Sequence, residues 1–254
     1  MARAVRRYRW LAQYYDQIFT SHLSLCEAAR RRVLGRLLPR VVSACDLACG
    51  TGTTAVGLAR TGIRMFAVDL SPLMCRQARA KARRADVPVC VLRGDMRSFR
   101  LPEPVGLVLC EYDALNHVPR KADLARVTQA VARALRPGGW FYFDVNNRLA
   151  FEKVWSGAWW TEKPGVAVVM HGGYDRRPGR GWCNVEWFLR QGRGWRRRRE
   201  RVEQVAWTEG EMRGTLRAAG FDRIRAWDAT LFFKGDPSIR RGCRTFYLAR
   251  KGAG

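Results

Sequence analysis

The chain alternates short apolar runs with helical segments between residues 41 and 146, and this alternation constrains its fold more than any other feature. The apolar runs cover residues 41–47, 64–70, 87–92, 106–111 and 140–145, and helical patterns lie between them at residues 55–60, 72–85 and 122–135. Ser71 and Pro72 provide a hydroxyl cap and a first-turn proline for the second of these helices. Strands that alternate with helices pair in parallel, with helices on both faces. We therefore predict an α/β fold with a doubly wound, mostly parallel sheet.

The alternation stops after residue 146. Strand patterns at residues 166–172, 182–190 and 195–207 follow one another through glycine-rich joints without helices, as in an antiparallel meander. Thr208 and Glu211 then form a capping-box pattern. Apolar runs at residues 223–229 and 244–249 complete a seven-stranded main sheet. We predict an antiparallel β insertion at residues 147–207, within an α/β domain made of residues 41–146 and 208–254.

A helical cap is expected at residues 1–40, before the first strand of the α/β domain. Residues 23–38 carry apolar side chains at helical spacing, and Pro39 ends the pattern. We expect the arginines at positions 30–32 and 36 to lie on the other faces of this helix.

The balance of charges is strongly basic. Lys and Arg total 47 against 22 acidic residues, which gives a net charge of +25. Such a field favours an anionic partner, such as nucleic acid, an acidic membrane surface or an acidic substrate. Only six of the basic residues are Lys, so biased composition explains the charge equally well.

The eight cysteines are scattered and form no C-x-x-C pair, and the three histidines lie far apart, so we expect no metal site. Unpaired thiols are typical of a cytoplasmic protein. No apolar stretch reaches the roughly 18 residues of a spanning helix, and no long apolar region follows the basic N-terminus. We therefore expect neither a membrane partner nor a signal peptide.

A glycine-containing turn follows the first predicted strand, at residues 46–52, and a helix leaves it. Glycine lets the backbone approach a ligand closely, and the helix start offers free N–H groups. Asp69 ends the second strand, where an acid can accept from both hydroxyls of a ribose. Asp95 ends the third strand, where it could accept from an adenine amino group. Both acids fall at the carboxyl edge of the sheet, where such folds bind ligands.

Residues 46–52, 67–70, 94–96 and 110–118 together resemble the successive motifs of class I S-adenosylmethionine-dependent methyltransferases, and residues 136–139 resemble the turn before strand five. Ala48 stands where this family has its first loop glycine. The resemblance implies a Rossmann-like fold and S-adenosylmethionine as cofactor. It also implies cofactor contacts by Tyr15, Asp46, Ala48, Gly50, Gly52, Asp69, Leu70, Asp95, Met96, Cys110 and Glu111. Tyr15 is included because residues 15–18 resemble the N-terminal segment of glycine and sarcosine N-methyltransferases, in which a tyrosine covers the methionine part of the cofactor.

Methyl transfer from an activated sulfonium needs proximity, alignment and exclusion of water more than acid–base chemistry. Tyr112, Asn116 and His117 follow strand four and are the candidate catalytic residues. His117 could remove a proton from the acceptor, or it could be a structural hydrogen-bonding group. The candidate substrate-binding residues are Tyr14, Asn146, Arg148, Trp159 and Trp187. Seven of the ten tryptophans fall at residues 155–207, so this insertion is either a lid over a pocket or the core of a small sheet.

Three functions remain open from the sequence. The motifs favour methylation of a small molecule at nitrogen, oxygen or carbon. The basic charge alone favours an RNA- or DNA-modifying methyltransferase, with the arginines at residues 196–199 as a solvated face or a contact with substrate or partner. A protein that binds the cofactor without turnover is the third class. The sequence indicates no oligomeric state.

Overall fold

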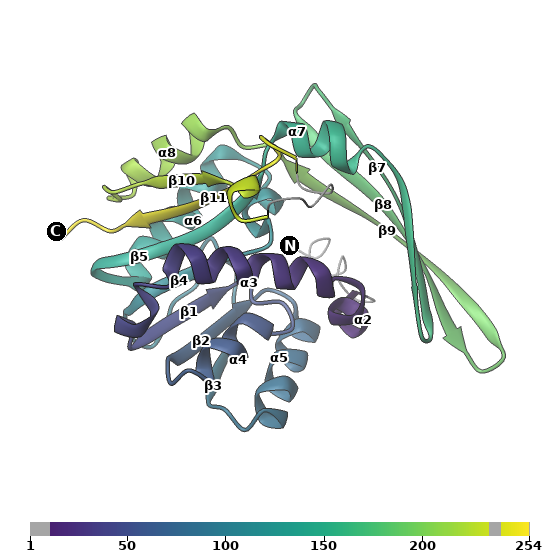
Figure 1. Cartoon of the computed structure of the whole chain (residues 1–254), viewed down its shortest axis with the longest axis horizontal. Coiled ribbons are helices and arrows are strands. Elements are labelled where there is room, and N and C mark those ends of the chain that lie inside the picture. The colour runs from purple at the N-terminus through teal and green to yellow at the C-terminus, as the bar shows by residue number, and fades with distance from the viewer. Residues whose placement is uncertain (1–10, 234–239, 254) are drawn as a thin grey trace.

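The computed structural model describes residues 11–233 and 240–253. Its main sheet has seven strands in the order β10-β11-β5-β4-β1-β2-β3 (Figure 1). These are β1 (Ser43–Leu47), β2 (Arg64–Asp69), β3 (Val89–Arg93), β4 (Val105–Cys110), β5 (Leu135–Asn146), β10 (Arg225–Asp228) and β11 (Arg244–Arg250). The first five pair in parallel, and β11 pairs antiparallel to both β5 and β10. The predicted mostly parallel, seven-stranded Rossmann-like sheet is confirmed.

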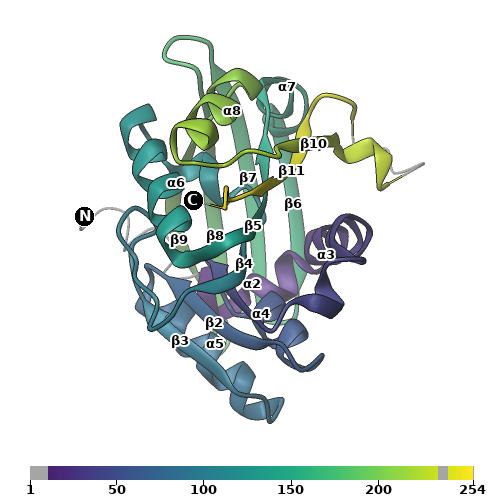
Figure 2. The same cartoon turned by 90° about the vertical axis from the view of Figure 1, so that its left-hand side faces the viewer.

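Helices cover both faces of this sheet because its central strands alternate between two apolar clusters. On β5, Phe141 and Phe143 belong to one cluster and Tyr142 to the other. The helices are α2 (Leu11–Ile18), α3 (Thr20–Leu34), α4 (Thr53–Ala59), α5 (Pro72–Arg84), α6 (Lys121–Ala134) and α8 (Glu209–Ala218). α6 and α8 pack on the first face and α3, α4 and α5 on the second, and Figure 2 shows α8 and α3 on opposite sides of the sheet.

Two predicted helix starts are confirmed in detail. Ser71 Oγ accepts from the backbone N–H of Met74 at the start of α5. Thr208 and Glu211 form the reciprocal capping box of α8. The first ten residues of the predicted cap lie outside the described residues, and α2 and α3 are its described helices. Short helical turns complete the chain: η1 (Leu38–Arg40), η2 (Ala114–His117), α7 (Arg148–Ala150), η3 (Phe151–Trp155) and η4 (Ala229–Leu231).

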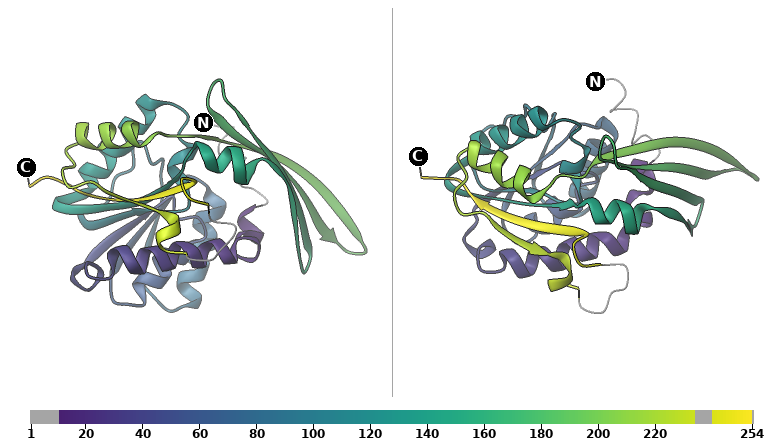
Figure 3. Two further views of the ribbon diagram at one scale, coloured as in Figure 1. Left: turned by 45° about the horizontal axis from the view of Figure 1, so that its top comes forward. Right: turned by 90° about the horizontal axis from the view of Figure 1, so that it is seen from above.

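A second, antiparallel sheet is built from β6 (Gly157–Lys163), β7 (Val166–Asp175), β8 (Arg180–Gln191) and β9 (Gly194–Val205). β7, β8 and β9 agree with the predicted strands. β6 was not predicted, because its residues are mostly exposed and show no alternation of apolar and polar side chains. One face of this sheet packs against α2 through an apolar cluster that contains Val168, Val185 and Trp187. Figure 3 shows the far end of this sheet extending beyond the body of the α/β domain.

Among residues 11–233 and 240–253, no helix is long and apolar enough to cross a membrane. Within the same residues, no three His, Cys, Asp or Glu side chains form a group that could hold a metal ion.

The first prediction concerns Gly52, which lies where a side chain does not fit. It lies before α4 at φ +79°, and a Cβ added to it would lie 2.8 Å from Cβ of Ala78 on α5. Gly52→Ala should therefore lower the free energy of unfolding by about 2–4 kcal/mol, through left-handed strain and overpacking. Urea unfolding measures this. Gly57→Ala is the matched control, because Gly57 is exposed within α4 and its added Cβ meets nothing within 4 Å. Equal stability of the two variants would contradict the prediction.

Candidate active site

A cavity of about 1390 Å³ opens at the carboxyl edge of the main sheet. It is lined by the loop after β1, the ends of β2 and β3, the segment after β4, helices α2 and α3, and the rim of the second sheet. The predicted cofactor residues that line it are Tyr15, Asp46, Ala48, Gly50, Asp69, Leu70, Asp95, Met96 and Glu111. A pocket for one drug-sized ligand holds about 300–1,000 Å³. This cavity therefore has room for two molecules.

The loop after β1 is held by two buried acids. Asp69 Oδ2 accepts from the backbone N–H of Gly50 at 3.0 Å, and its Oδ1 accepts from that of Ser71 at 2.8 Å. Asp46 Oδ2 accepts from the N–H of Ala55 at the start of α4 at 3.1 Å. Burial raises the pKa of Asp69 to about 6 and that of Asp46 to about 7. Both acids thus fix the loop while their carboxyl groups line the cavity.

Two predicted cofactor residues do not line the cavity among the residues that the structure describes. Cys110 is fully buried in the apolar cluster beneath α6 and α8, because it is the last residue of β4 and faces into the core. Gly52 serves packing, since α5 approaches it too closely for a side chain. These two predictions are corrected.

Asp95 lines the cavity next to Met96, but it already has a partner. Arg97 contacts both carboxylate oxygens, with Nη2 to Oδ2 at 2.6 Å and Nε to Oδ1 at 3.0 Å. The Arg97 hydrogen bond lowers the pKa of Asp95. An adenine amino group would therefore share this carboxylate with Arg97, a contact that the sequence did not indicate.

Glu111 forms a buried ion pair with an arginine of α3. Its Oε2 accepts from Arg30 Nη1 at 2.5 Å and from Thr54 Oγ at 2.9 Å. Its Oε1 is buried and has no hydrogen-bond partner among the described residues. Burial raises the pKa of Glu111, and Arg30 opposes that shift.

Arg30 lies on the buried face of α3, which corrects the expectation that it lies on another face. It stands four residues from both Cys26 and Leu34, which are buried on that face. This helical spacing was the signal that could have identified it.

Helix α2 is tied to the loop after β1 by a second charged cluster. Lys81 Nζ on α5 contacts Asp16 Oδ2 at 2.5 Å and Thr51 Oγ at 3.0 Å. Thr51 Oγ also donates to Asp16 Oδ1 at 2.6 Å. The neighbouring Tyr15 ring meets the Tyr112 ring edge-on, with centroids 6.1 Å apart. α2 therefore closes one side of the cavity.

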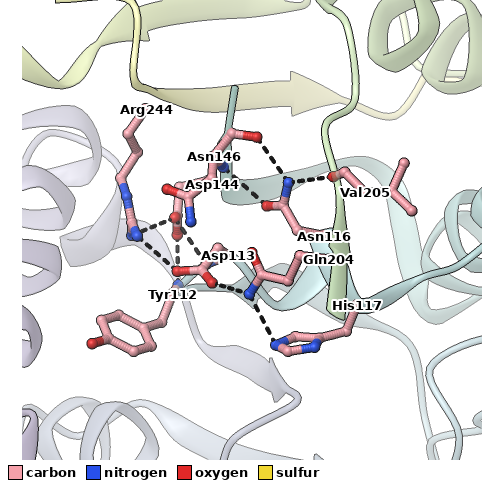
Figure 4. A network of polar contacts seen from close by, with 9 residues as sticks. All are labelled: Tyr112, Asp113, Asn116, His117, Asp144, Asn146, Gln204, Val205 and Arg244. Atoms are coloured by element: carbon pink, nitrogen blue, oxygen red, sulfur yellow. Dashed lines mark hydrogen bonds and ion pairs between the residues drawn. The ribbon is translucent and has the colours of Figure 1, made fainter. Parts of the chain in front are cut away.

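The turn after β4 has an unusual backbone. Tyr112 and Asp113 lie at φ +65° and +48°, a left-handed region that costs energy for residues other than glycine. Their consecutive N–H groups donate to the two oxygens of Asp144 on β5, at 2.6 and 2.9 Å. Arg244 on β11 bridges Asp144 and Asp113 at 2.8 and 2.7 Å (Figure 4). The strained turn is thus held by an ion-paired carboxylate and directs the Tyr112 ring into the cavity lining.

Asn116 lines the cavity and also clamps the backbone, and its predicted catalytic role stays a prediction. Its Nδ2 donates to the carbonyl oxygens of Asn146 and Val205, at 2.8 and 2.7 Å. Its Oδ1 accepts from the N–H of Asn146 at 2.9 Å. Both amide protons are therefore committed to backbone groups, and the side chain joins η2 to the ends of β5 and β9 (Figure 4).

His117 lines the cavity and contacts the second sheet. Its Nε2 lies 3.1 Å from Nε2 of Gln204 on β9, and the same Gln204 nitrogen donates to Asp113 Oδ2. Gln204 is 3% exposed. Neither Gln204 nor Arg244 belongs to a sequence motif. The one sign of Gln204 in the sequence is a polar residue at a position of β9 where the strand pattern predicts a buried side chain.

The predicted substrate-binding residues of the second sheet and α2 are corrected, because two of them pack in an apolar cluster and the third is partly exposed. Trp187 is fully buried, and its Nε1 donates to Glu200 at 2.8 Å. Tyr14 packs on the same apolar cluster. Trp159 is 41% exposed, on the same face of the sheet as Met170. None of the three predicted residues is among the described residues that line the cavity.

Asn146 and Arg148 are corrected for a related reason. Asn146 is buried, with its backbone held by Asn116, and it borders a separate small cavity of about 140 Å³. Arg148 is exposed and lies 3.8 Å from Glu152, one turn along the chain. Among the described residues of β8, Arg180 is the arginine that lines the large cavity.

Comparison with known proteins identifies the domain that holds this cavity. A family model described as a methyltransferase domain matches residues 44–139. A solved S-adenosylmethionine-dependent methyltransferase from Clostridium acetobutylicum ATCC 824 has a TM-score of 0.78 at 21% identity, covering 96% of this chain and 99% of that chain. Residues 44–139 therefore form a methyltransferase domain, and the chain has the fold of an S-adenosylmethionine-dependent methyltransferase. The predictions of this family and of its cofactor are confirmed.

Two sequence relatives of the methyltransferase domain are enzymes named for small molecules. The ubiquinone biosynthesis O-methyltransferase of Paracidovorax citrulli (strain AAC00-1) is 34% identical over 108 residues, which are 41% of this chain and 44% of that protein. The dTDP-4-amino-2,3,4,6-tetradeoxy-D-glucose N,N-dimethyltransferase of Saccharopolyspora spinosa is 34% identical over 102 residues, 40% of this chain and 39% of that protein. The chain thus spans less than half the length of either relative.

The residues that line the cavity fit S-adenosylmethionine. The methionine part of this cofactor carries an ammonium and a carboxylate. The unpartnered Oε1 of Glu111 suits the ammonium, and the Arg30 guanidinium beside it suits the carboxylate. Asp69 lies where a ribose would need an acceptor.

Cofactor affinity should depend on the ionisation of Asp69. A ribose hydroxyl donates to the ionised carboxylate, and the pKa of Asp69 is about 6. Affinity should be full above that pH and should fall up to about tenfold for each unit below it. Calorimetry with S-adenosylhomocysteine measures this.

Asp69→Asn should weaken binding at neutral pH by about 1–3 kcal/mol and reduce the acid dependence. Asp86→Asn is the control, because Asp86 is exposed and already left-handed, at φ +50°, a conformation that asparagine tolerates. Wild-type affinity in Asp69→Asn would refute the role of Asp69.

Proposed function

We propose that this chain transfers the methyl group of S-adenosylmethionine to a nitrogen, oxygen or carbon atom of a small molecule, by in-line displacement. The observation that carries the proposal is the cavity of about 1390 Å³, which can hold donor and acceptor together. Both relatives named above act on small molecules by name, which supports the same class of acceptor.

The bound cofactor supplies an activated methyl group on a sulfonium. The contribution of the chain is then to bind, orient and exclude water. Asp69 and Glu111 orient the two ends of the cofactor, and the Tyr112 turn limits the approach of the acceptor. Helix α2 and the rim of the second sheet border the cavity on the side away from the main sheet.

Residues 147–207 act in this proposal as a lid that contributes to the acceptor side, with residues 1–40 as a second cover. Arg180 and Gln204 support the first part, since both belong to the second sheet and line the cavity. Asp16 and Tyr15 on α2 support the second part. A cytoplasmic location is also proposed, supported by eight cysteines that are all free thiols.

Two of the arginines at residues 196–199 are ion-paired within the second sheet. Arg197 and Arg199 both pair with Glu186. Adjacent residues of a strand face opposite ways, so Glu186 and these arginines lie on the face away from Trp187 and α2. The charge of Arg197 and Arg199 is thus partly neutralised, and both side chains lie on the face opposite to the cluster that packs on α2.

A transfer assay tests the proposed function. The purified chain is incubated with methyl-labelled S-adenosylmethionine and a panel of amino sugars, nucleotide-linked sugars, phenols and small amines, with RNA and DNA alongside. We expect saturable labelling of a small molecule and release of S-adenosylhomocysteine. An Arg197→Ser/Arg199→Ser double variant should keep this activity. Labelling of nucleic acid alone, or cofactor binding without any transfer, would overturn the proposal.

A further inference from the structure

Among the described residues, seven Lys and Arg side chains line the large cavity, and most of them are already ion-paired. They are Arg30, Arg31, Arg60, Lys81, Arg84, Arg97 and Arg180. Four of them pair with a carboxylate at 2.5 or 2.6 Å. The other three, Arg60, Arg84 and Arg180, form no ion pair with any residue that the structure describes. These three are the candidates for binding a negative charge that comes from a ligand.

Arg60 and Arg84 lie away from the acceptor side, where His117 and Gln204 line the cavity. Helices α4 and α5 start at the carboxyl edge of the main sheet and run back toward its other edge, because the strands that they connect are parallel. Arg60 follows the last residue of α4, and Arg84 is the last residue of α5. These helices are about 10 and 20 Å long. Of the three arginines, Arg180 is therefore the one on the acceptor side.

Arg180 is the first residue of β8, at the end of the second sheet that lies near η2. Its Nη2 lies 3.4 Å from the carbonyl oxygen of Pro119, which follows η2. Val205, opposite Arg180 on β9, lines the cavity with it. A guanidinium has five N–H donors, and this single contact is long for a hydrogen bond. Most of the donors of this half-buried side chain are therefore left for a ligand.

Two acids lie near Arg180 along the strands, but each has another partner. Asp175 on β7 stands opposite Arg180, and its Oδ1 accepts from Trp182 Nε1 at 3.2 Å. Glu203 on β9 lines the cavity, and its Oε1 pairs with Arg201 at 3.1 Å. Neither acid forms an ion pair with Arg180. The second sheet therefore presents a guanidinium to the cavity without supplying the anion that would pair with it.

We propose that Arg180 determines the specificity of the site by binding an anionic oxygen group of the acceptor, a carboxylate or a phosphate. This inference rests on the proposed function and narrows the acceptor to a small molecule that carries such an anion. A planar guanidinium can donate two parallel hydrogen bonds to either group. Arg180 would then be a functional part of the basic charge, in contrast to Arg197 and Arg199, which pair with Glu186.

Matched acceptors in the transfer assay test this proposal. The members of each pair differ in one anionic group: a sugar phosphate and its free sugar, and a hydroxybenzoate and its amide. Any other acceptor that the wild type labels is compared with its own neutral or anionic analogue. We expect kcat/KM to favour an anionic member by about 10- to 100-fold, as for hydrogen bonds to a charged group, and the two pairs distinguish phosphate from carboxylate. Equal or better use of the neutral members would overturn the proposal.

Substitutions of Arg180 test whether this residue causes the preference. Arg180→Gln should lower kcat/KM for the anionic member to near that of the neutral member, mainly through KM, without changing the affinity for S-adenosylhomocysteine. Arg180→Lys keeps the charge without the planar fork and should restore part of the preference. Arg190→Gln is the matched control, because Arg190 is exposed near the other end of β8 and is not among the described residues that line the cavity.

An unchanged preference in Arg180→Gln would refute the assignment, and a missing preference in the wild type refutes it even if that variant does not fold. The two proposals fail separately. Absence of any transfer by the wild type defeats the proposed function, and the assignment of Arg180 with it. Transfer by the wild type that does not depend on an anionic group or on Arg180 defeats only the assignment of Arg180.

Discussion

Arg244 bridges two buried carboxylates, and the acceptor side of the cavity depends on these ion pairs. Burial lowers the pKa of Arg244, but Asp144 and Asp113 raise it above its ordinary value overall. The charged guanidinium lets Asp144 hold the left-handed turn at Tyr112 and lets Asp113 orient Gln204. Removal of the guanidinium alone would leave two acids facing each other in the interior, a more costly defect than a lost hydrogen bond.

The cofactor side of the site could be predicted from sequence because its geometry is local. Asp69 ends a strand, the Ser71–Pro72 pair starts the next helix, and Gly50 lies in the turn between strand and helix. Parallel strands bring such ends to one edge whatever the rest of the chain does. The acceptor side has no such local rule. Arg244 lies 131 residues from Asp113, and only the antiparallel pairing of β11 with β5 brings them together.

Side-chain direction explains the predictions that had to be corrected. The alternation of β8 does place Trp187 and Glu186 on opposite faces, but it does not say which face meets α2. Trp187 therefore lies in the apolar cluster, although its residue type suggested that it would line a ligand pocket. Arg30 shows the reverse case, since it was expected on a face other than the apolar one, and it lies on the buried face of α3 and pairs with Glu111.

The cofactor side and the acceptor side of the cavity also differ in how many of their residues lie within the family match. The family match covers residues 44–139 and so includes Asp69, Glu111 and His117. Gln204 and Arg244 lie beyond it, on strands that follow β5. The match therefore covers most of the cofactor side of the cavity, whereas Gln204, which lines the cavity beside His117, comes from a strand outside the match. The side chains of the acceptor side thus come from both the matched region and the strands that follow it, and the matched region alone does not account for them.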